Sequence, residues 1–159
     1  MKDSLKQDFT RRLSQCNRGG MIVIIYDIFF AYEDDARSAL QAQNWVAWKQ
    51  AIHKMQETLD ELIYSLDFSY KIAGNLYQLY SYFKVVLAKL LYTRQEEGLT
   101  EVSEMMHKLY LSFCEAAKQD QSKPLMSNTQ QVYAGMTYGR SELNENYMSI
   151  QDTQRGFLA

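Results

Sequence analysis

The residues best able to do chemistry in this sequence are two histidines, two cysteines and several neighbouring carboxylates. Glu104 and His107 have the Glu-x-x-His spacing that supplies one half of the di-metal sites found in helical bundles. A complete site needs a second such pair together with inward carboxylates from other helices, and the sequence offers neither. It therefore does not predict a metal site, and a metal-containing bundle enzyme is the weakest function that we consider.

The other reactive groups stand alone in the sequence. Cys114 follows His107 by about two helical turns, but no residue arranges the pair as nucleophile and base. Gly19-Gly20 lacks the Lys-Ser/Thr that completes a phosphate-binding loop, and Glu33-Asp34-Asp35 is most simply a solvated helix face. Cys16 and Cys114 are expected to be reduced thiols. We therefore predict no catalytic residue, no metal ligand and no cofactor, so the protein is not expected to be an enzyme.

The composition favours one helical domain of ordinary size. The chain has 159 residues, of which 47% are hydrophobic, with one proline and seven glycines. Long periodic segments without proline favour an all-α protein. A net charge of −2, without a long basic run, argues against nucleic acid as a partner. The longest apolar run, residues 21–25, is far too short to span a membrane, and no signal peptide is recognised, so we expect a cytoplasmic protein without membrane insertion.

Four stretches repeat apolar residues at intervals of mostly three and four, the spacing of side chains on one face of an α-helix. They are residues 21–41, 45–67, 70–94 and 99–120. Asn44 is the expected N-cap of the second helix, Gly98 the expected end of the third, and Thr100 a candidate cap of the fourth. Short turns between such helices predict an antiparallel, up-down four-helix bundle with shallow crossing angles.

The N-terminal segment is less regular than the four predicted helices. Leu5, Phe9 and Leu13 lie four residues apart, so residues 1–16 form either a short helical segment or a frayed terminus. Residues 17–20, Asn-Arg-Gly-Gly, are expected to break the chain before the first long helix.

The C-terminal part differs in composition from the rest of the chain. Residues 121–159 are rich in polar residues and have no lasting helical period. We therefore divide the chain into a helical-bundle domain, residues 1–120, and a C-terminal tail, residues 121–159. The tail is expected to be flexible or to dock partly on the bundle, in the second case through Tyr133, Tyr138 and Phe157.

The third predicted helix has more apolar surface than one contact face needs. One row is expected to supply the core: Ile72, Leu76, Leu79, Phe83, Val86 and Leu90. A second row lies beside it and contains Tyr77, Tyr80, Leu87 and Leu91. The tyrosines are explained either by amphipathic packing or by a surface that holds an apolar partner segment. We interpret the first row as core and the second as surplus surface that is available to a partner.

Several motifs resemble the flagellar export chaperone family FliS. Residues 20–27, GMIVIIYD, resemble the family's opening helix, and residues 65–67, Ser-Leu-Asp, resemble the end of its second helix. The strongest match is residues 72–83, IAGNLYQLYSYF, against the family pattern Ile-Ala-x-Asn-Leu-x-x-Leu-Tyr-x-Tyr-Met, from which Phe83 departs. The resemblance covers about residues 9–120.

This resemblance implies a cytoplasmic, flagellin-specific chaperone without catalytic activity. Such a protein binds the C-terminal segment of flagellin, prevents its premature polymerisation and assists its delivery to the flagellar type III export apparatus. Components of the export gate are further expected partners, and the expected state is a monomer or a weak homodimer. The alternative is a non-catalytic adaptor, or a structural helical bundle that associates with itself through the same face.

The expected contact surface combines the third helix with adjoining faces of the first two. Asn75 either bonds the partner's backbone or is an ordinary surface amide, and Tyr26 either contacts the partner or holds the helix packing. The candidate partner-binding residues are Ile25, Tyr26, Phe29, Met55, Leu62, Asn75, Leu76, Leu79, Tyr80 and Phe83.

Overall fold

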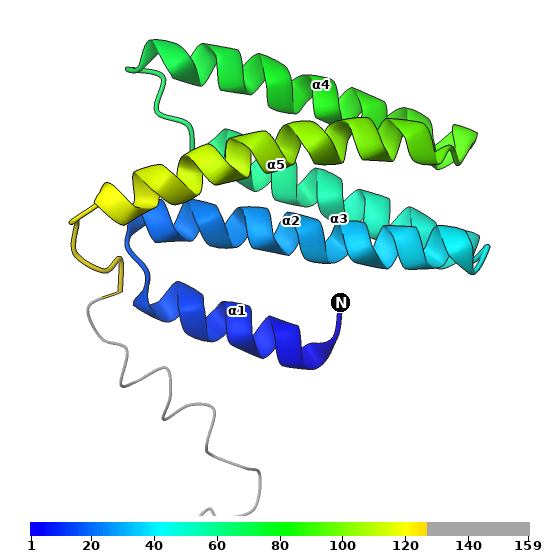
Figure 1. The fold of residues 1–159 in the computed structure, drawn as a ribbon, viewed down its shortest axis with the longest axis horizontal. Coiled ribbons are helices and arrows are strands. Elements are labelled where there is room, and N and C mark those ends of the chain that lie inside the picture. Colours follow the sequence, from blue (N-terminus) through cyan, green and yellow to red (C-terminus); the bar gives the residue numbers. More distant parts are fainter. Residues whose placement is uncertain (127–159) are drawn as a thin grey trace, which may run out of the picture. The chain divides into compact units, whose positions relative to one another are not determined.

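A computed structural model describes residues 1–126, and this part of the chain is helical without any strand (Figure 1). The helices are α1 (Asp3–Gln15), α2 (Arg18–Gln41), α3 (Trp45–Tyr64), α4 (Lys71–Thr93) and α5 (Glu96–Gln119). The predicted all-α fold class is therefore confirmed for the described residues. The predicted docking of the tail through Tyr133, Tyr138 and Phe157 lies outside the described residues.

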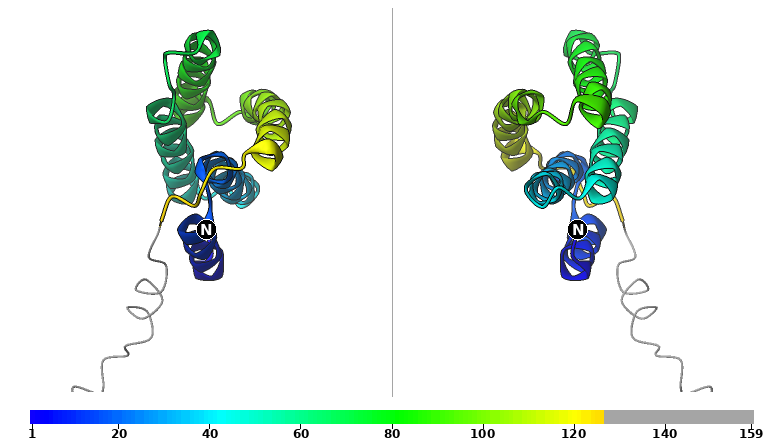
Figure 2. Two further views of the ribbon diagram at one scale, coloured as in Figure 1. Left: turned by 90° about the vertical axis from the view of Figure 1, so that its left-hand side faces the viewer. Right: turned by 90° about the vertical axis from the view of Figure 1, so that its right-hand side faces the viewer.

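The four long helices contact one another in a closed cycle. α2 packs against α3 and α5, and α4 packs against the same two helices. Short connections, residues 42–44, 65–70 and 94–95, reverse the chain direction between successive helices (Figure 1). Viewed end-on, α2 and α4 lie on opposite sides of this group (Figure 2). Among the described helices, α1 contacts α2 alone, on the side away from α4.

The core lies where these helices face one another. Its largest fully buried side chains include Tyr26 and Phe29 of α2, Trp48 of α3, and Tyr80 and Phe83 of α4. Burying a large apolar side chain contributes about 1.5–3 kcal/mol, so this cluster supplies much of the driving force for folding. Trp48 also donates a hydrogen bond from Nε1 to the carbonyl oxygen of Leu90 at 3.2 Å, which satisfies its polar atom inside the core.

The start of α2 differs from the prediction that residues 17–20 break the chain. The Asn17 side chain accepts a hydrogen bond from the amide of Gly20 at 2.9 Å and so caps a helix that already begins at Arg18. Cys16 and Asn17 alone separate this helix from α1. Of the two alternatives for the N-terminal segment, the structure shows the helix, which buries Phe9 and pairs Arg12 with Asp27 at 2.5 Å.

The ends of the other helices confirm one predicted cap and correct two. Asn44 caps α3 by accepting a hydrogen bond from the amide of Ala47 at 3.1 Å, as predicted. Gly98 does not end α4, because α4 stops at Thr93 and Gly98 lies inside α5, where it allows close packing on Leu90. Thr100 also lies within α5 and caps nothing.

Glu33 is buried, although the sequence suggested a solvated face there. Only 6% of Glu33 is exposed, and its carboxylate is fully paired. Arg37 approaches it to 2.7 Å, and the hydroxyl of Ser103 donates a hydrogen bond to it at 2.9 Å. These partners offset the cost of burying a charge and tie α2 to α5.

Asp120 joins the end of α5 to the start of α2. Its carboxylate accepts hydrogen bonds from the amides of Gly19 and Ser122, each at 2.9 Å, and its carbonyl accepts one from the Asn17 side chain at 2.9 Å. The helix dipole favours a negative charge at the N-terminus of α2. A Cβ atom at Gly19 would lie 2.9 Å from a carboxylate oxygen of Asp120, so the close approach depends on glycine.

We predict that Gly19→Ala lowers the free energy of unfolding by about 1–3 kcal/mol, because the added methyl pushes Asp120 and Ala117 of the α5 end away from the start of α2. Gly74→Ala is the matched control, since a Cβ there meets no atom within 4 Å, and it is expected to raise stability by about 0.5–1 kcal/mol. Urea unfolding followed by circular dichroism measures both. Equal stabilities of the Gly19 and Gly74 variants would contradict the proposed close approach.

We also predict an acid-sensitive contribution from Asp120. Hydrogen bonds from Ser122 and then Gly19 hold the pKa of its carboxyl below its usual value of 3.8. A group with a lowered folded-state pKa stabilises the fold above its unfolded-state pKa, and this contribution is lost as the pH falls through the folded value. The stability difference between the wild type and Asp120→Asn should therefore shrink on acidification in thermal unfolding experiments. A difference that stays constant with pH would refute this role.

Candidate partner-binding surface

An apolar cavity of about 170 Å³ opens where α3 ends and α4 begins, and we call it the α3–α4 cavity. Its lining comes from the start of α2, the end of α3, the start of α4 and the last part of α5. The lining residues are Ile22, Leu62, Ser65, Leu66, Asp67, Tyr70, Ile72, Ala73, Leu76, Tyr80 and Phe113. A neighbouring depression of about 390 Å³ shares Ile22 and Phe113 with it and continues along the start of α2 and the end of α5.

The turn between α3 and α4 leaves one side of this cavity open. Asp67 accepts hydrogen bonds within the turn, from the amide of Ser69 to its side chain at 2.9 Å and from the amide of Tyr70 to its carbonyl at 3.2 Å. The helix restarts immediately afterwards, so Ile72 lies in its first turn and is 64% exposed. Leu76, one turn later, is 9% exposed and forms part of the wall.

Two tyrosines meet beside the buried side of the cavity. The hydroxyl oxygens of Tyr26 and Tyr80 lie 2.7 Å apart, so one hydroxyl donates a hydrogen bond to the other. Burial raises the pKa of both phenols above the usual range, and for Tyr26 the neighbouring Tyr80 raises the pKa further. Both groups are therefore neutral at physiological pH, and the wall of the cavity that Tyr80 forms carries no charge.

Exposed aromatic residues lie on the segments that line the cavity, and one of them, Tyr70, belongs to its lining. Phe68 and Tyr70 of the connection are 64% and 66% exposed, and Tyr77 of α4 is 46% exposed. The rings of Phe68 and Tyr77 pack against each other with centroids 6.0 Å apart. Together with Ile72 they form an apolar rim, and grouped exposed side chains of this kind mark interaction sites in soluble proteins.

The structure buries most of the residues predicted to bind a partner. Seven of the ten candidates are core residues: Tyr26, Phe29, Met55, Leu62, Leu76, Tyr80 and Phe83. A side chain without exposed surface cannot contact a partner while the helices remain packed, although Leu62, Leu76 and Tyr80 do line the cavity. Asn75 is exposed, and Ile25 and Leu79 are half-buried against the core. Partner contact by any of the ten residues stays a prediction.

The orientation of α4 also differs from the prediction. Its buried residues are Ala73, Leu76, Tyr80, Phe83, Leu87 and Leu90. The direction that faces the core thus lies between the two predicted rows, so Ile72 of the supposed core row is exposed. Tyr80 and Leu87 of the supposed surplus row are instead buried.

Sequence reasoning missed several residues of the cavity and its rim. Ile22 of α2, Leu66 of the connection between α3 and α4, and Phe113 of α5 lie far apart in the sequence, and only packing brings them together. Phe68 lies in a turn that was predicted only as a connection, and Tyr70, which was predicted to begin the third helix, belongs to the same turn. The available signal was the density of aromatic residues beside this turn, which exceeds what a short connection requires.

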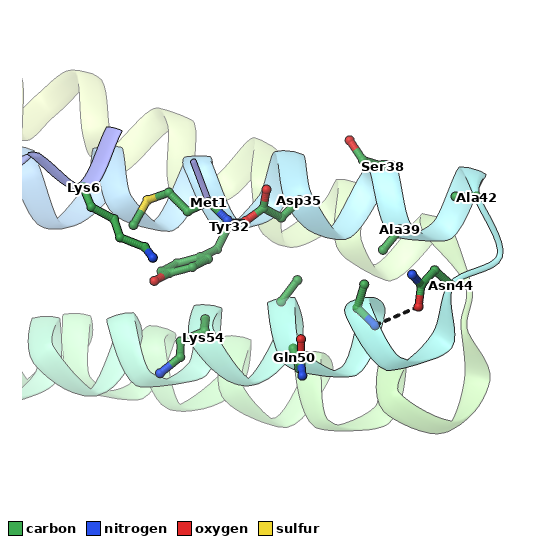
Figure 3. A pocket seen from close by; sticks show the side chains of 12 residues that line it. Met1, Lys6, Tyr32, Asp35, Ser38, Ala39, Ala42, Asn44, Gln50 and Lys54 are labelled. Atoms are coloured by element: carbon green, nitrogen blue, oxygen red, sulfur yellow. Dashed lines mark hydrogen bonds and ion pairs between the residues drawn. The ribbon is translucent and has the colours of Figure 1, made fainter. Parts of the chain in front are cut away.

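A larger depression, of about 690 Å³, lies between the start of α1, α2 and the start of α3. Figure 3 shows Met1, Lys6 and Tyr32 on its α1–α2 side and Gln50 and Lys54 on α3. The N-terminal ammonium forms an ion pair with Asp35 there, and charged groups line the opening. It resembles a solvated gap beside α1 rather than an apolar binding site.

The described residues show no grouping of potential metal ligands. They contain no cluster of three or more histidine, cysteine, aspartate or glutamate side chains that could hold a metal ion. His107, which the sequence paired with Glu104, packs against Phe30 with ring centroids 4.3 Å apart.

Comparison with known proteins identifies the family of the chain. A family model described as the flagellar protein FliS matches residues 1–120, which include all five helices and the whole lining of the cavity. A search of curated proteins found no match. Within residues 1–126, no helix is both long and apolar enough to cross a membrane. Because the family match extends over 120 of the 159 residues, the chain belongs to the FliS family of flagellar export chaperones.

Proposed function

We propose that this protein is a cytoplasmic, flagellin-specific export chaperone. It binds the C-terminal segment of flagellin, prevents premature polymerisation, and assists delivery to the flagellar type III export apparatus, where components of the export gate are further partners. Family membership supports the chaperone role. The cycle of contacts among α2, α3, α4 and α5 supports the predicted up-down four-helix bundle as a rigid frame for binding.

The open α3–α4 cavity is the observation that carries this proposal. Its volume of about 170 Å³ is similar to that of apolar cavities of about 150 Å³ that hold benzene, so it suits one large apolar side chain. Asp67 is the one charged residue in its lining, and the turn already uses that carboxylate. The site therefore favours a segment that buries an apolar residue over a polar small molecule.

A flagellin terminus has the matching physical need. Its apolar face pairs into a helical core only after export, so that face must be covered until then. An amphipathic segment can place one anchor residue in the cavity and lay neighbouring apolar residues on the rim of Phe68, Tyr70 and Ile72. Ordering a flexible segment on binding lowers the net affinity, which suits a partner that must later be released.

Asn75 is placed to contribute polar contacts beside this rim. It lies three residues after Ile72 on α4, so the two side chains are neighbours on the helix surface. Asn75 is exposed, and its amide both donates and accepts hydrogen bonds. It therefore suits a contact with the backbone of a bound segment.

We predict that Ile72→Asp weakens binding of a flagellin C-terminal peptide about tenfold or more, because the peptide loses an apolar contact worth about 1.5–3 kcal/mol. Ile72 is 64% exposed and lies in the first turn of α4, where the helix dipole favours a carboxylate, so the fold should persist. Isothermal titration calorimetry measures the affinity.

Val85→Asp is the matched control, because Val85 is 53% exposed on the same helix but does not line the cavity. It should leave the affinity unchanged. Equal losses in the two variants would show that the cavity is not the site. If the wild type does not bind the peptide and its sedimentation mass rises with concentration, the self-associating alternative is favoured instead.

A further inference from the structure

A further depression, of about 540 Å³, lies between the start of α3 and the end of α4, and we call it the Trp45 depression. The two hollows use opposite parts of α3, because Trp45 to His53 line this depression whereas Leu62 lines the α3–α4 cavity. Figure 1 shows the start of α3 and the end of α4 on its right-hand side, opposite the turn that joins the two helices. Its lining residues are Trp45, Val46, Trp48, Lys49, Gln50, His53, Leu91, Tyr92 and Arg94.

Large apolar side chains are unusually exposed around this depression. Tyr92 is 86% exposed, Val46 is 71% exposed and Trp45 is 39% exposed. Beneath them Trp48 is fully buried and fixed by its hydrogen bond to Leu90. The exposed side chains thus lie on a rigid base, and leaving them in water is unfavourable compared with covering them.

The charged residues that line this depression are all basic. Lys49 and Arg94 are cations, His53 becomes one when protonated, and no lining residue is acidic. Within residues 1–126, no carboxylate forms an ion pair with Lys49, His53 or Arg94. The depression therefore combines apolar surface with positive charge that the described part of the chain does not neutralise.

Arg94 combines an unusual backbone conformation with a contact to the Trp45 ring. It ends α4 with φ 54° and ψ 33°, the left-handed region that favours glycine. Its guanidinium carbon lies 4.3 Å from the centroid of the Trp45 ring, within the range of a cation–π interaction. Arginine thus occupies a backbone position that glycine adopts more easily. Its planar guanidinium lies beside the exposed Trp45 ring and can donate hydrogen bonds to a carboxylate.

We propose that the Trp45 depression binds an acidic segment of a partner protein. The segment covers Trp45 and Tyr92 with an apolar side chain and places carboxylates against Arg94 and Lys49. Charge complementarity selects an acidic partner, and the exposed rings select one that also carries an apolar residue. The few cations surround one depression instead of following a track, which favours a peptide over single-stranded nucleic acid. This surface is separate from the proposed flagellin site, so both can be occupied at once.

The chain contains its own reporter for a test. It has two tryptophans, and both Trp45 and Trp48 line this depression. Tryptophan emission of the full chain can therefore be titrated with a short peptide rich in Asp and Glu that carries one central Phe and no Trp. We expect a saturable change in emission that weakens as salt is added. The same peptide with Ser in place of Phe, and a third with Lys in place of the acidic residues, should bind much more weakly.

Arg94→Gly is the decisive variant, because glycine suits the left-handed backbone at this position and the variant should fold at least as well. It should bind the acidic peptide about tenfold more weakly. Lys108→Ala, which removes an exposed cation of α5, and Ile72→Asp, which alters the other site, should both leave this affinity unchanged.

Three results would overturn the proposal. They are an absence of any saturable emission change, equal binding of the acidic and Ser-substituted peptides, and unchanged affinity in Arg94→Gly. Tighter binding of single-stranded polyuridylate or of anionic lipid vesicles, lost in Arg94→Gly, would also overturn it by assigning the surface to another class of partner. Because flagellin peptide binding is measured separately, failure of one site is distinguishable from failure of the other.

Discussion

Burial of one face of α4 is the constraint on which the rest of the structure depends. That face consists of Ala73, Leu76, Tyr80, Phe83, Leu87 and Leu90. α4 contacts only α3 and α5 among the described helices, so this face must hold it in place. The helix has more apolar residues than the face requires, and the surplus is exposed along its length, most strongly at Ile72 in the first turn and Tyr92 in the last. Both proposed binding surfaces follow from this excess.

The two surfaces differ in chemistry because different neighbours meet at each end. At the first turn of α4, residues of all four long helices enclose a cavity whose single charge is used by the turn. At the last turn, α3 alone lies beside α4 in the lining, and Arg94 and Lys49 bring positive charge that no carboxylate of residues 1–126 pairs with. A partner bound at the α3–α4 cavity would therefore leave the Trp45 depression free. The contacts of Asp120 fix the end of α5 to the start of α2 and so stabilise the packing of the long helices.

Local signals in the sequence predicted the helices, whereas packing decided the surfaces. The spacing of apolar residues and the Asn44 cap depend on neighbouring residues only, so both agree with the structure. Gly98 was misassigned because glycine signals both a helix end and a close contact, and here it packs on Leu90. The rotation of α4 about its axis depends on α3 and α5, so its own sequence could not show that Tyr80 is buried while Ile72 is exposed. The cavity likewise joins segments far apart in the chain.

Hydrogen–deuterium exchange of the full chain, with and without a flagellin C-terminal peptide, tests the central claim most directly. The connection between α3 and α4, residues 65–70, forms one side of the cavity and has few regular backbone hydrogen bonds. If the cavity holds the partner, amides of this connection and of the first turns of α4 become slower to exchange, while those near Trp45 do not change. Unchanged exchange in residues 65–80, with the peptide demonstrably bound, would contradict the account.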